Sequence, residues 1–206
     1  MKCLVLAALT LAATPVLATT YTLEPNYTQV VISWDHLGFS HPTAQIAQGT
    51  GVLEFDPAQP TMSSLEVTLP VTSLITGVPD LDEHLKSADF FDVAKFPRAT
   101  FRSTRVEKGM AKDQLEVTGD LTVRDVTRPV TLHVQVLKLG DNPRTGVATV
   151  GFNATGLLRR SDFKLDAFVP QVSDEIALRI TCQGAEALGQ AAFLKGKEEK
   201  ARAKKQ

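Results

Sequence analysis

Residues 114–136 read QLEVTGDLTVRDVTRPVTLHVQV, and this stretch decides the fold class. Apolar side chains recur at every second position from Leu115 to Val123, interrupted only by Gly119, and again from Val130 to Val136. A period of two places successive side chains on opposite faces of a strand, so each half predicts a strand with one apolar face. Turn-forming residues, Asp125–Pro129, lie between the halves, and two strands that a short turn joins must run antiparallel.

The same alternation recurs along the rest of the chain. It is regular in Leu65–Val71 and Ile176–Cys182, and it is less regular in Gln29–Trp34, Gly49–Asp56, Ala99–Val106 and Gly146–Leu157. The 22 threonines and 20 valines of the chain also favour strands. These patterns predict an all-β domain of about eight antiparallel strands.

One segment, Val78–Ser87, breaks the alternation. Pro79 favours a first helical turn, acidic residues follow it, and Leu81 and Leu85 share one helix face at a spacing of four. We therefore expect a short helix between two strands, continuing into Ala88–Phe91.

Eight antiparallel strands with one apolar face can form either a two-layer sandwich or a closed barrel. The small residues Gly119, Gly151, Ala154 and Gly156 lie within predicted strands, where they fit strong bending or an internal cavity better than a filled core. Long strands around an eight-stranded barrel leave room for an elongated apolar ligand. The sequence therefore favours a ligand-holding barrel, with the sandwich as the alternative.

The first 18 residues have the pattern of a secretory signal peptide. Lys2 precedes an apolar run from Leu4 to Leu17, and small residues end at Ala18, where we expect cleavage. The predicted organisation is a signal peptide at 1–18, a single domain at 19–184 and a tail at 185–206. Cleavage would remove Cys3 and leave Cys182 alone, which excludes an intramolecular disulfide in the mature chain.

The formal net charge of −1 hides two regions of opposite sign. From Lys195 to the end the charge is +4, whereas the body from Thr19 to Leu194 carries −6. An acidic body argues against nucleic-acid binding. The tail predicts either a helix or a disordered solubilising end, with weak contact to anionic membrane surfaces as a second interpretation.

Residues that carry catalytic or metal chemistry are sparse. Cys182 falls on the apolar phase of the last strand, where burial makes a thiol inert and argues against a disulfide between two chains. The oligomeric state stays open, with a dimer as one option. The four histidines show no recognised ligand spacing, and a site of His36, His41 and His84 would require the helix to fold over the first strand. We therefore expect no catalytic residue, no metal and no cofactor.

Phenylalanine dominates the aromatic residues, with ten Phe against two Tyr and one Trp. Phenylalanines are suited either to plug a barrel or to wall a pore for a flexible apolar chain, which needs no hydrogen bonds. Arg160 predicts a charge pair with Asp162 that pins the loop before the last strand; the alternative is that Arg159 or Arg160 contacts an anionic or carbonyl headgroup at the barrel mouth. The candidate ligand-binding residues are Phe39, Phe55, Leu85, Phe90, Phe91, Phe101, Leu121, Phe152, Phe163, Phe168, Leu178 and Arg160.

Five motifs in order give the chain a family resemblance: Asp82–Ser87, Phe90–Phe101, Val117–Val123, Arg160–Phe163 and Val172–Ile176. Together they resemble the YceI-like family of exported polyisoprenoid-binding proteins, from about Tyr21 to Gly184. The resemblance implies a lipocalin-like, eight-stranded antiparallel barrel with a helix beside it. It also implies an elongated pore for an isoprenoid or fatty chain, such as an isoprenoid quinone, in the periplasm. The chain departs from the family at Leu81, where arginine is usual, and at Lys164, where glycine is usual.

The expected function is therefore periplasmic binding, transport or sequestration of a long-chain lipid without catalysis. One alternative is a stress-related protein-interaction module whose barrel is filled by side chains. A second alternative is an enzyme that acts on an isoprenoid inside the pore.

Overall fold

The structure is a computed structural model, and it describes residues 18–203. The predicted signal peptide therefore lies, apart from Ala18, outside the described residues. Ten strand segments form a single sheet. Their bounds are β1 Thr19–Leu23, β2 Gln29–Ser33, β3 Thr43–Ile46, β4 Thr50–Phe55, β5 Ser64–Pro70, β6 Arg98–Lys108, β7 Gln114–Val123, β8 Val126–Asp141, β9 Ala148–Arg159 and β10 Glu175–Glu186.

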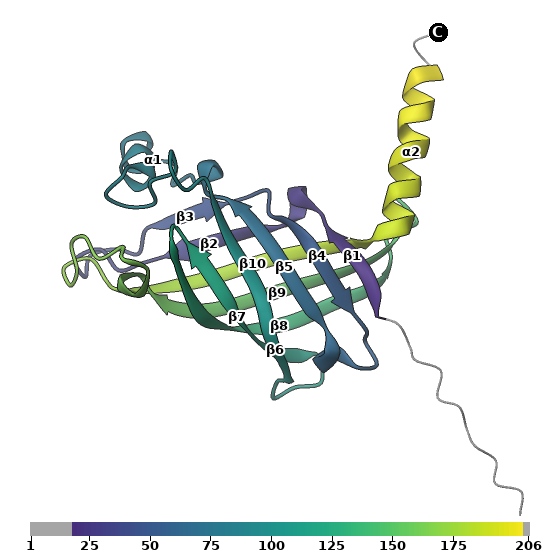
Figure 1. The fold of residues 1–206 in the computed structure, drawn as a ribbon, viewed down its shortest axis with the longest axis horizontal. Coiled ribbons are helices and arrows are strands. Elements are labelled where there is room, and N and C mark those ends of the chain that lie inside the picture. Colours follow the sequence, from purple (N-terminus) through teal and green to yellow (C-terminus); the bar gives the residue numbers. More distant parts are fainter. Residues whose placement is uncertain (1–17, 204–206) are drawn as a thin grey trace, which may run out of the picture.

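The ten segments make an eight-stranded closed antiparallel barrel (Figure 1). β1 and β2 pair with successive parts of β10, since Leu23 lies opposite Gly184 and Gln29 lies opposite Thr181. They therefore occupy one barrel position, interrupted by a 3₁₀ turn at Pro25–Tyr27 (η1). In the same way β3 pairs with β2 and β4 pairs with β1, so these two segments occupy a second position. The pairing of β1 with β10 closes the ring and confirms the predicted barrel.

The eight strands that the sequence predicts all occur, and the two additional segments are short. β1 follows directly on the predicted signal peptide, and β3 has only four residues, TAQI, too few to establish a period of two. Both become strands because longer neighbours supply their hydrogen-bond partners.

Glycine permits two close approaches within the barrel wall. A β-carbon on Gly51 would lie 2.0 Å from the carbonyl oxygen of Glu66, and one on Gly119 would lie 2.4 Å from Cζ of Phe101. Neither contact is possible for any other residue without a shift of the neighbour. Gly119 thereby leaves space for the Phe101 ring inside the barrel.

Side chains fill one end of the barrel, in a group that we call the plug: Tyr21, Leu23, Phe55, Val150 and Phe152, all buried. The rings of Phe55 and Phe152 pack edge to face with centroids 5.6 Å apart. The plug belongs to the main hydrophobic core and leaves the opposite end of the barrel to a cavity.

Two helices flank the barrel at opposite ends (Figure 1). Helix α1, Pro79–Lys86, covers the cavity end and buries Leu85 in a small cluster with Ala44, Ile46 and Leu74. Helix α2, Ala187–Ala203, extends away from the plug end and buries none of its residues. The tail that the sequence left as helix or disorder is thus a helix up to Ala203. Among residues 18–203, no helix combines the length and apolar character that a membrane span needs.

Candidate functional site

An apolar cavity of about 520 Å³ occupies the α1 end of the barrel. Inward-facing residues of the sheet form most of its wall, and α1 with the two loops around His36–Leu37 and Leu165–Val172 forms its mouth. The lining residues from strands include Val30, Ile32, Ala99, Phe101, Leu121, Val123, Val130, Leu132, Leu158, Ile176, Leu178 and Ile180. Such a volume lies within the usual range of small-ligand sites.

The alternation of the strands explains why these side chains face inward. In β8, Val130 and Leu132 are buried and line the cavity, whereas Thr131 between them is exposed. In β10, Ile176 and Leu178 do the same on either side of the exposed Ala177. The cavity wall is therefore almost wholly aliphatic and aromatic, and it is suited to a ligand that forms no hydrogen bonds.

The structure brings most of the predicted binding residues to the cavity wall. Those that line it are Leu85, Phe90, Phe91, Phe101, Leu121, Arg160, Phe163, Phe168 and Leu178. Phe55 and Phe152 lie instead in the plug, because they face inward at the opposite end of the barrel. Phe39 lies at the tip of the loop between β2 and β3, where 89% of its surface is exposed.

Several lining residues were missing from the sequence-derived set. Ile32 and Trp34 come from β2 and the residue after it, and Leu132 comes from β8. The signal that could have identified Leu132 is its position on the apolar phase of a regularly alternating strand. Trp34 follows the last residue of β2 and shares the phase of Val30 and Ile32, so the same signal applies to it.

Arg160 holds the loop before β10 by four hydrogen bonds to backbone carbonyls. Its Nε donates to Ser173 at 2.9 Å, one terminal nitrogen donates to Val172 at 2.9 Å, and the other donates to Ala167 at 2.8 Å and to Leu165. The guanidinium is buried, and burial lowers its pKa, opposed by the nearby carboxylates of Asp174 and Asp166.

The predicted charge pair between Arg160 and Asp162 is wrong. Asp162 instead lies 3.8 Å from Nε of Arg159, and both side chains are largely exposed. The loop is pinned, as predicted, but by carbonyl acceptors, because the turn at Arg160–Phe163 (η4) directs Arg160 inward and Asp162 outward.

Aromatic rings close part of the mouth between α1 and this loop. The His84 ring packs against Phe90 with centroids 4.9 Å apart, and it lies 6.1 Å from Phe168. Phe90 and Phe168 are stacked at 6.4 Å. The mouth therefore combines apolar rings with the polar groups of His36, His84 and Gln171, all of which line the cavity.

The two departures from the family pattern have distinct places. Leu81 lines the cavity, so the wall at α1 is apolar where the resemblance implies arginine. Lys164 has a left-handed backbone with φ of 59°, a conformation that glycine adopts without cost. Its ammonium lies 3.6 Å from the carboxylate of Asp125 on the β7–β8 turn. The charge of Lys164 is therefore paired.

Residues with potential catalytic or metal chemistry lie apart. Cys182 is partly buried, and desolvation raises the pKa of its thiol to about 11. His41 is exposed and lies 3.6 Å from Asp35, away from His36 and His84 in the cavity lining. Within residues 18–203, no group of three or more His, Cys, Asp or Glu side chains is placed to hold a metal ion.

A closed antiparallel barrel with an apolar cavity open at one end defines a class of small-ligand-binding β-barrels. Within that class, residues 21–184 match the YceI-like domain model, and the chain belongs to the YceI-like family. It is 35% identical over 183 residues to Protein YceI of Escherichia coli O157:H7, which covers 88% of this chain and 94% of that protein.

Solved structures have the same fold. The crystal structure of Campylobacter jejuni YceI protein has a TM-score of 0.63 at 28% identity and covers 74% of this chain and 90% of its own. Burkholderia cenocepacia BcnA has a TM-score of 0.67 at 22% identity, with 76% and 95% covered. A polyisoprenoid binding domain from Saccharophagus degradans has a TM-score of 0.61 at 14% identity, with 83% and 99% covered.

Proposed function

We propose that this protein binds an isoprenoid or another long-chain amphiphilic lipid in its cavity and carries or sequesters it in the periplasm without reaction. The observation that carries the proposal is the apolar cavity of about 520 Å³, closed by the plug at one end and open at the other. Membership of the YceI-like family and the fold shared with a polyisoprenoid binding domain support the choice of ligand class.

The cavity volume sets the length of chain that fits. At about 30 Å³ for each water-sized group, 520 Å³ holds roughly 17 carbon groups, or three to four isoprene units. Burying each CH₂ contributes about 0.8 kcal/mol, or on the order of 14 kcal/mol in total before the costs of association and chain ordering. With those costs at about 5 kcal/mol, the affinity is near micromolar.

The polar headgroup of such a lipid would remain at the mouth. His36, His84 and Gln171 are the residues there that can contact it, since Arg160 already donates to four carbonyls. A neutral or quinone-type headgroup suits this set, because histidine and glutamine side chains offer hydrogen bonds without a fixed charge.

The two alternative functions have less support. A barrel filled by side chains, which the protein-interaction hypothesis requires, does not fit a cavity of this size. An enzyme would have to rely on His36 and His84, because none of the described lining residues is a serine, threonine, cysteine, tyrosine, lysine or carboxylate. Cys182 lies outside the lining, and its raised pKa keeps it as an unreactive thiol near neutral pH.

Organic-solvent extraction of the purified protein, followed by mass spectrometry, tests the proposal. We expect about one long-chain lipid for each protein molecule, either co-purified or taken up when delipidated protein is incubated with a bacterial lipid extract. Delipidated protein that takes up no lipid from the extract would contradict the proposal. Chemical conversion of the bound lipid during incubation would favour the enzyme alternative instead.

A further inference from the structure

Three large apolar side chains are exposed around the cavity mouth, and we call them the docking rim: Leu37, Phe39 and Phe168. Their exposed fractions are 50%, 89% and 61%. Leu37 and Phe168 also line the cavity, so the apolar surface is continuous from its interior to the outside of the protein. Water-exposed apolar side chains gathered around an apolar opening are typical of an interaction surface rather than of ordinary surface residues.

Two of these residues, Leu37 and Phe168, have a positive φ, which is an unfavourable backbone conformation for bulky side chains. Leu37 has φ of 59° and Gly38 has φ of 75°, and the amide of Phe39 donates to the carbonyl of His36 at 3.0 Å. This is the geometry of a type I′ turn, whose first central position favours asparagine or glycine. Phe168 also has a positive φ, of 65°. A bulky apolar residue is costly at such positions, which indicates a use for it there.

The amides of Leu37, Gly38 and Phe39 and the carbonyl of Phe168 are hydrogen-bonded within the protein. The amide of Leu37 donates to Gln171 at 3.2 Å, that of Gly38 donates to Oδ1 of Asp35 at 2.7 Å, and that of Val172 donates to Phe168 at 2.9 Å. The bond from Leu37 to Gln171 joins the β2–β3 loop to the loop before β10, and each of the other two lies within one loop. Backbone amides that enter an apolar medium need hydrogen-bond acceptors within the protein, because no water is available there.

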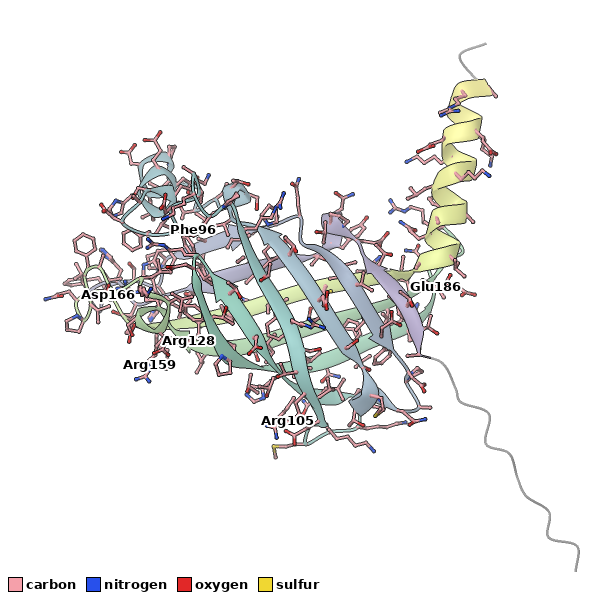
Figure 2. All side chains as sticks on the ribbon, in the orientation of Figure 1. Phe96, Arg105, Arg128, Arg159, Asp166 and Glu186 are labelled. Atoms are coloured by element: carbon pink, nitrogen blue, oxygen red, sulfur yellow. The ribbon has the colours of Figure 1, made fainter. Side chains whose placement is uncertain are left out.

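Some charged side chains near the docking rim have partners, whereas Asp166, two residues before Phe168, takes part in none of the ion pairs among the described residues. Asp35 lies 3.6 Å from His41, and the pairs Lys164–Asp125 and Arg159–Asp162 have separations of 3.6 and 3.8 Å. Figure 2 places Arg159 and Asp166 at the cavity end and Glu186 at the opposite end, where α2 begins. The basic residues of α2 therefore lie at the far end of the barrel from the docking rim (Figure 1).

From these observations we propose that the cavity end docks on the surface of a lipid bilayer, with Leu37, Phe39 and Phe168 inserted among the acyl chains. This inference rests on the proposed function, because docking places the cavity mouth against the bilayer. An apolar lipid tail then moves between bilayer and cavity without crossing water. The contact is apolar, so it does not depend on anionic lipid.

Co-flotation of the mature protein with phosphatidylcholine vesicles at about 0.5 M salt tests the docking, because that salt concentration screens the basic tail. We expect the wild-type protein to float with the vesicles. Phe39→Ser should lower the vesicle partition coefficient about tenfold, since a largely exposed phenyl ring loses its apolar burial. Phe39 does not line the cavity, so lipid already bound should be retained.

A second variant guards against an effect on folding. The triple variant Leu37→Asn, Phe39→Ser and Phe168→Asn places asparagine at both positive-φ positions, which it tolerates better than leucine or phenylalanine. It should fold and lose vesicle binding altogether. Met110→Ser is the matched control, because Met110 is fully exposed on the β6–β7 hairpin and distant in sequence from the docking rim. It should bind vesicles as the wild type does.

Equal partition of the wild type and Phe39→Ser would overturn the proposal, as would binding that needs anionic lipid and disappears at high salt. Failure to float, combined with retention of a co-purified lipid, refutes docking and leaves the proposed function standing. Flotation of protein that holds no lipid would support docking and contradict the proposed function. Cross-linking from position 39 to a protein in place of vesicle binding would assign the docking rim to a protein partner and overturn the proposal.

Discussion

Replacing Arg160 with methionine removes the donor that holds the loop at the cavity mouth. In the folded protein this guanidinium donates to the carbonyls of Leu165, Ala167, Val172 and Ser173, and 7% of the residue is exposed. Methionine fills a similar volume but leaves all these acceptors without their partner. Phe163 directly precedes this loop and Phe168 lies within it, and both line the cavity. A loosened loop should therefore disturb the cavity wall.

The size of the effect follows from the hydrogen bonds. A hydrogen bond from a charged group contributes about 1.5–3 kcal/mol, but the desolvation of a buried guanidinium offsets part of the sum. We therefore expect Arg160→Met to lower the free energy of unfolding by about 3–5 kcal/mol. Lysine offers a point charge in place of the planar fork, so Arg160→Lys should recover less than half of that loss.

Urea unfolding monitored by the fluorescence of Trp34 measures the loss. Arg159→Met is the matched control, since Arg159 is exposed and its pair with Asp162 at 3.8 Å should contribute about 0.5 kcal/mol or less. An unchanged midpoint for Arg160→Met, together with weaker binding of an anionic lipid, would refute the loop-pinning role. That result would make Arg160 a headgroup ligand.

Three further predictions concern the barrel and its plug. Phe152→Ala should cost about 3–5 kcal/mol of stability in thermal unfolding and extend the cavity, so that chains longer than 20 carbons gain affinity in titrations. Gly119→Ala brings a β-carbon to 2.4 Å from Phe101 and 2.5 Å from the Arg102 carbonyl, and it should cost about 1–3 kcal/mol, with an unchanged midpoint contradicting the close approach. Burial raises the pKa of Cys182 from 9.0 to about 11, so its contribution to stability is full below pH 9 and falls as the pH rises to 11. Cys182→Ala should flatten that part of the pH profile of unfolding, and native protein should resist alkylation at pH 8 until urea unfolds it.

The sequence predicts the barrel because alternation is strong in its long strands. Leu115–Val123 and Val130–Val136 identify both strands and their inward faces, but the predicted turn at Asp125–Pro129 is wrong because β8 already begins at Val126. Val78–Ser87 identifies α1, whereas the predicted continuation of this helix to Phe91 is wrong, since residues 88–91 form turns. Alternation does not show where along the barrel axis an inward-facing side chain lies. Phe101 and Phe152 are both inward-facing, yet one lines the cavity and the other fills the plug.

Loops are harder to predict than strands because single backbone torsions decide them. The direction of Arg160 depends on the η4 turn, which ends at Lys164 in a left-handed conformation. Leu37 itself has a left-handed backbone, which is unusual for leucine, and its exposure depends on this conformation. No periodic pattern reports these torsions, so the carbonyl contacts of Arg160 and the docking rim emerge only from the three-dimensional structure.

The most direct measurement of cavity binding is the stoichiometry with which delipidated protein binds geranylgeraniol, a 20-carbon isoprenoid. Ala99 lines the cavity, whereas the adjacent Thr100 is exposed on the outer face of β6. Ala99→Trp adds about nine non-hydrogen atoms to a cavity with room for roughly 17, so the 20-carbon chain should no longer fit and should lose its binding, while the wild type and Thr100→Trp should each bind one molecule. One-to-one binding by a folded Ala99→Trp variant, or no binding by the wild type, would contradict a lipid-holding cavity.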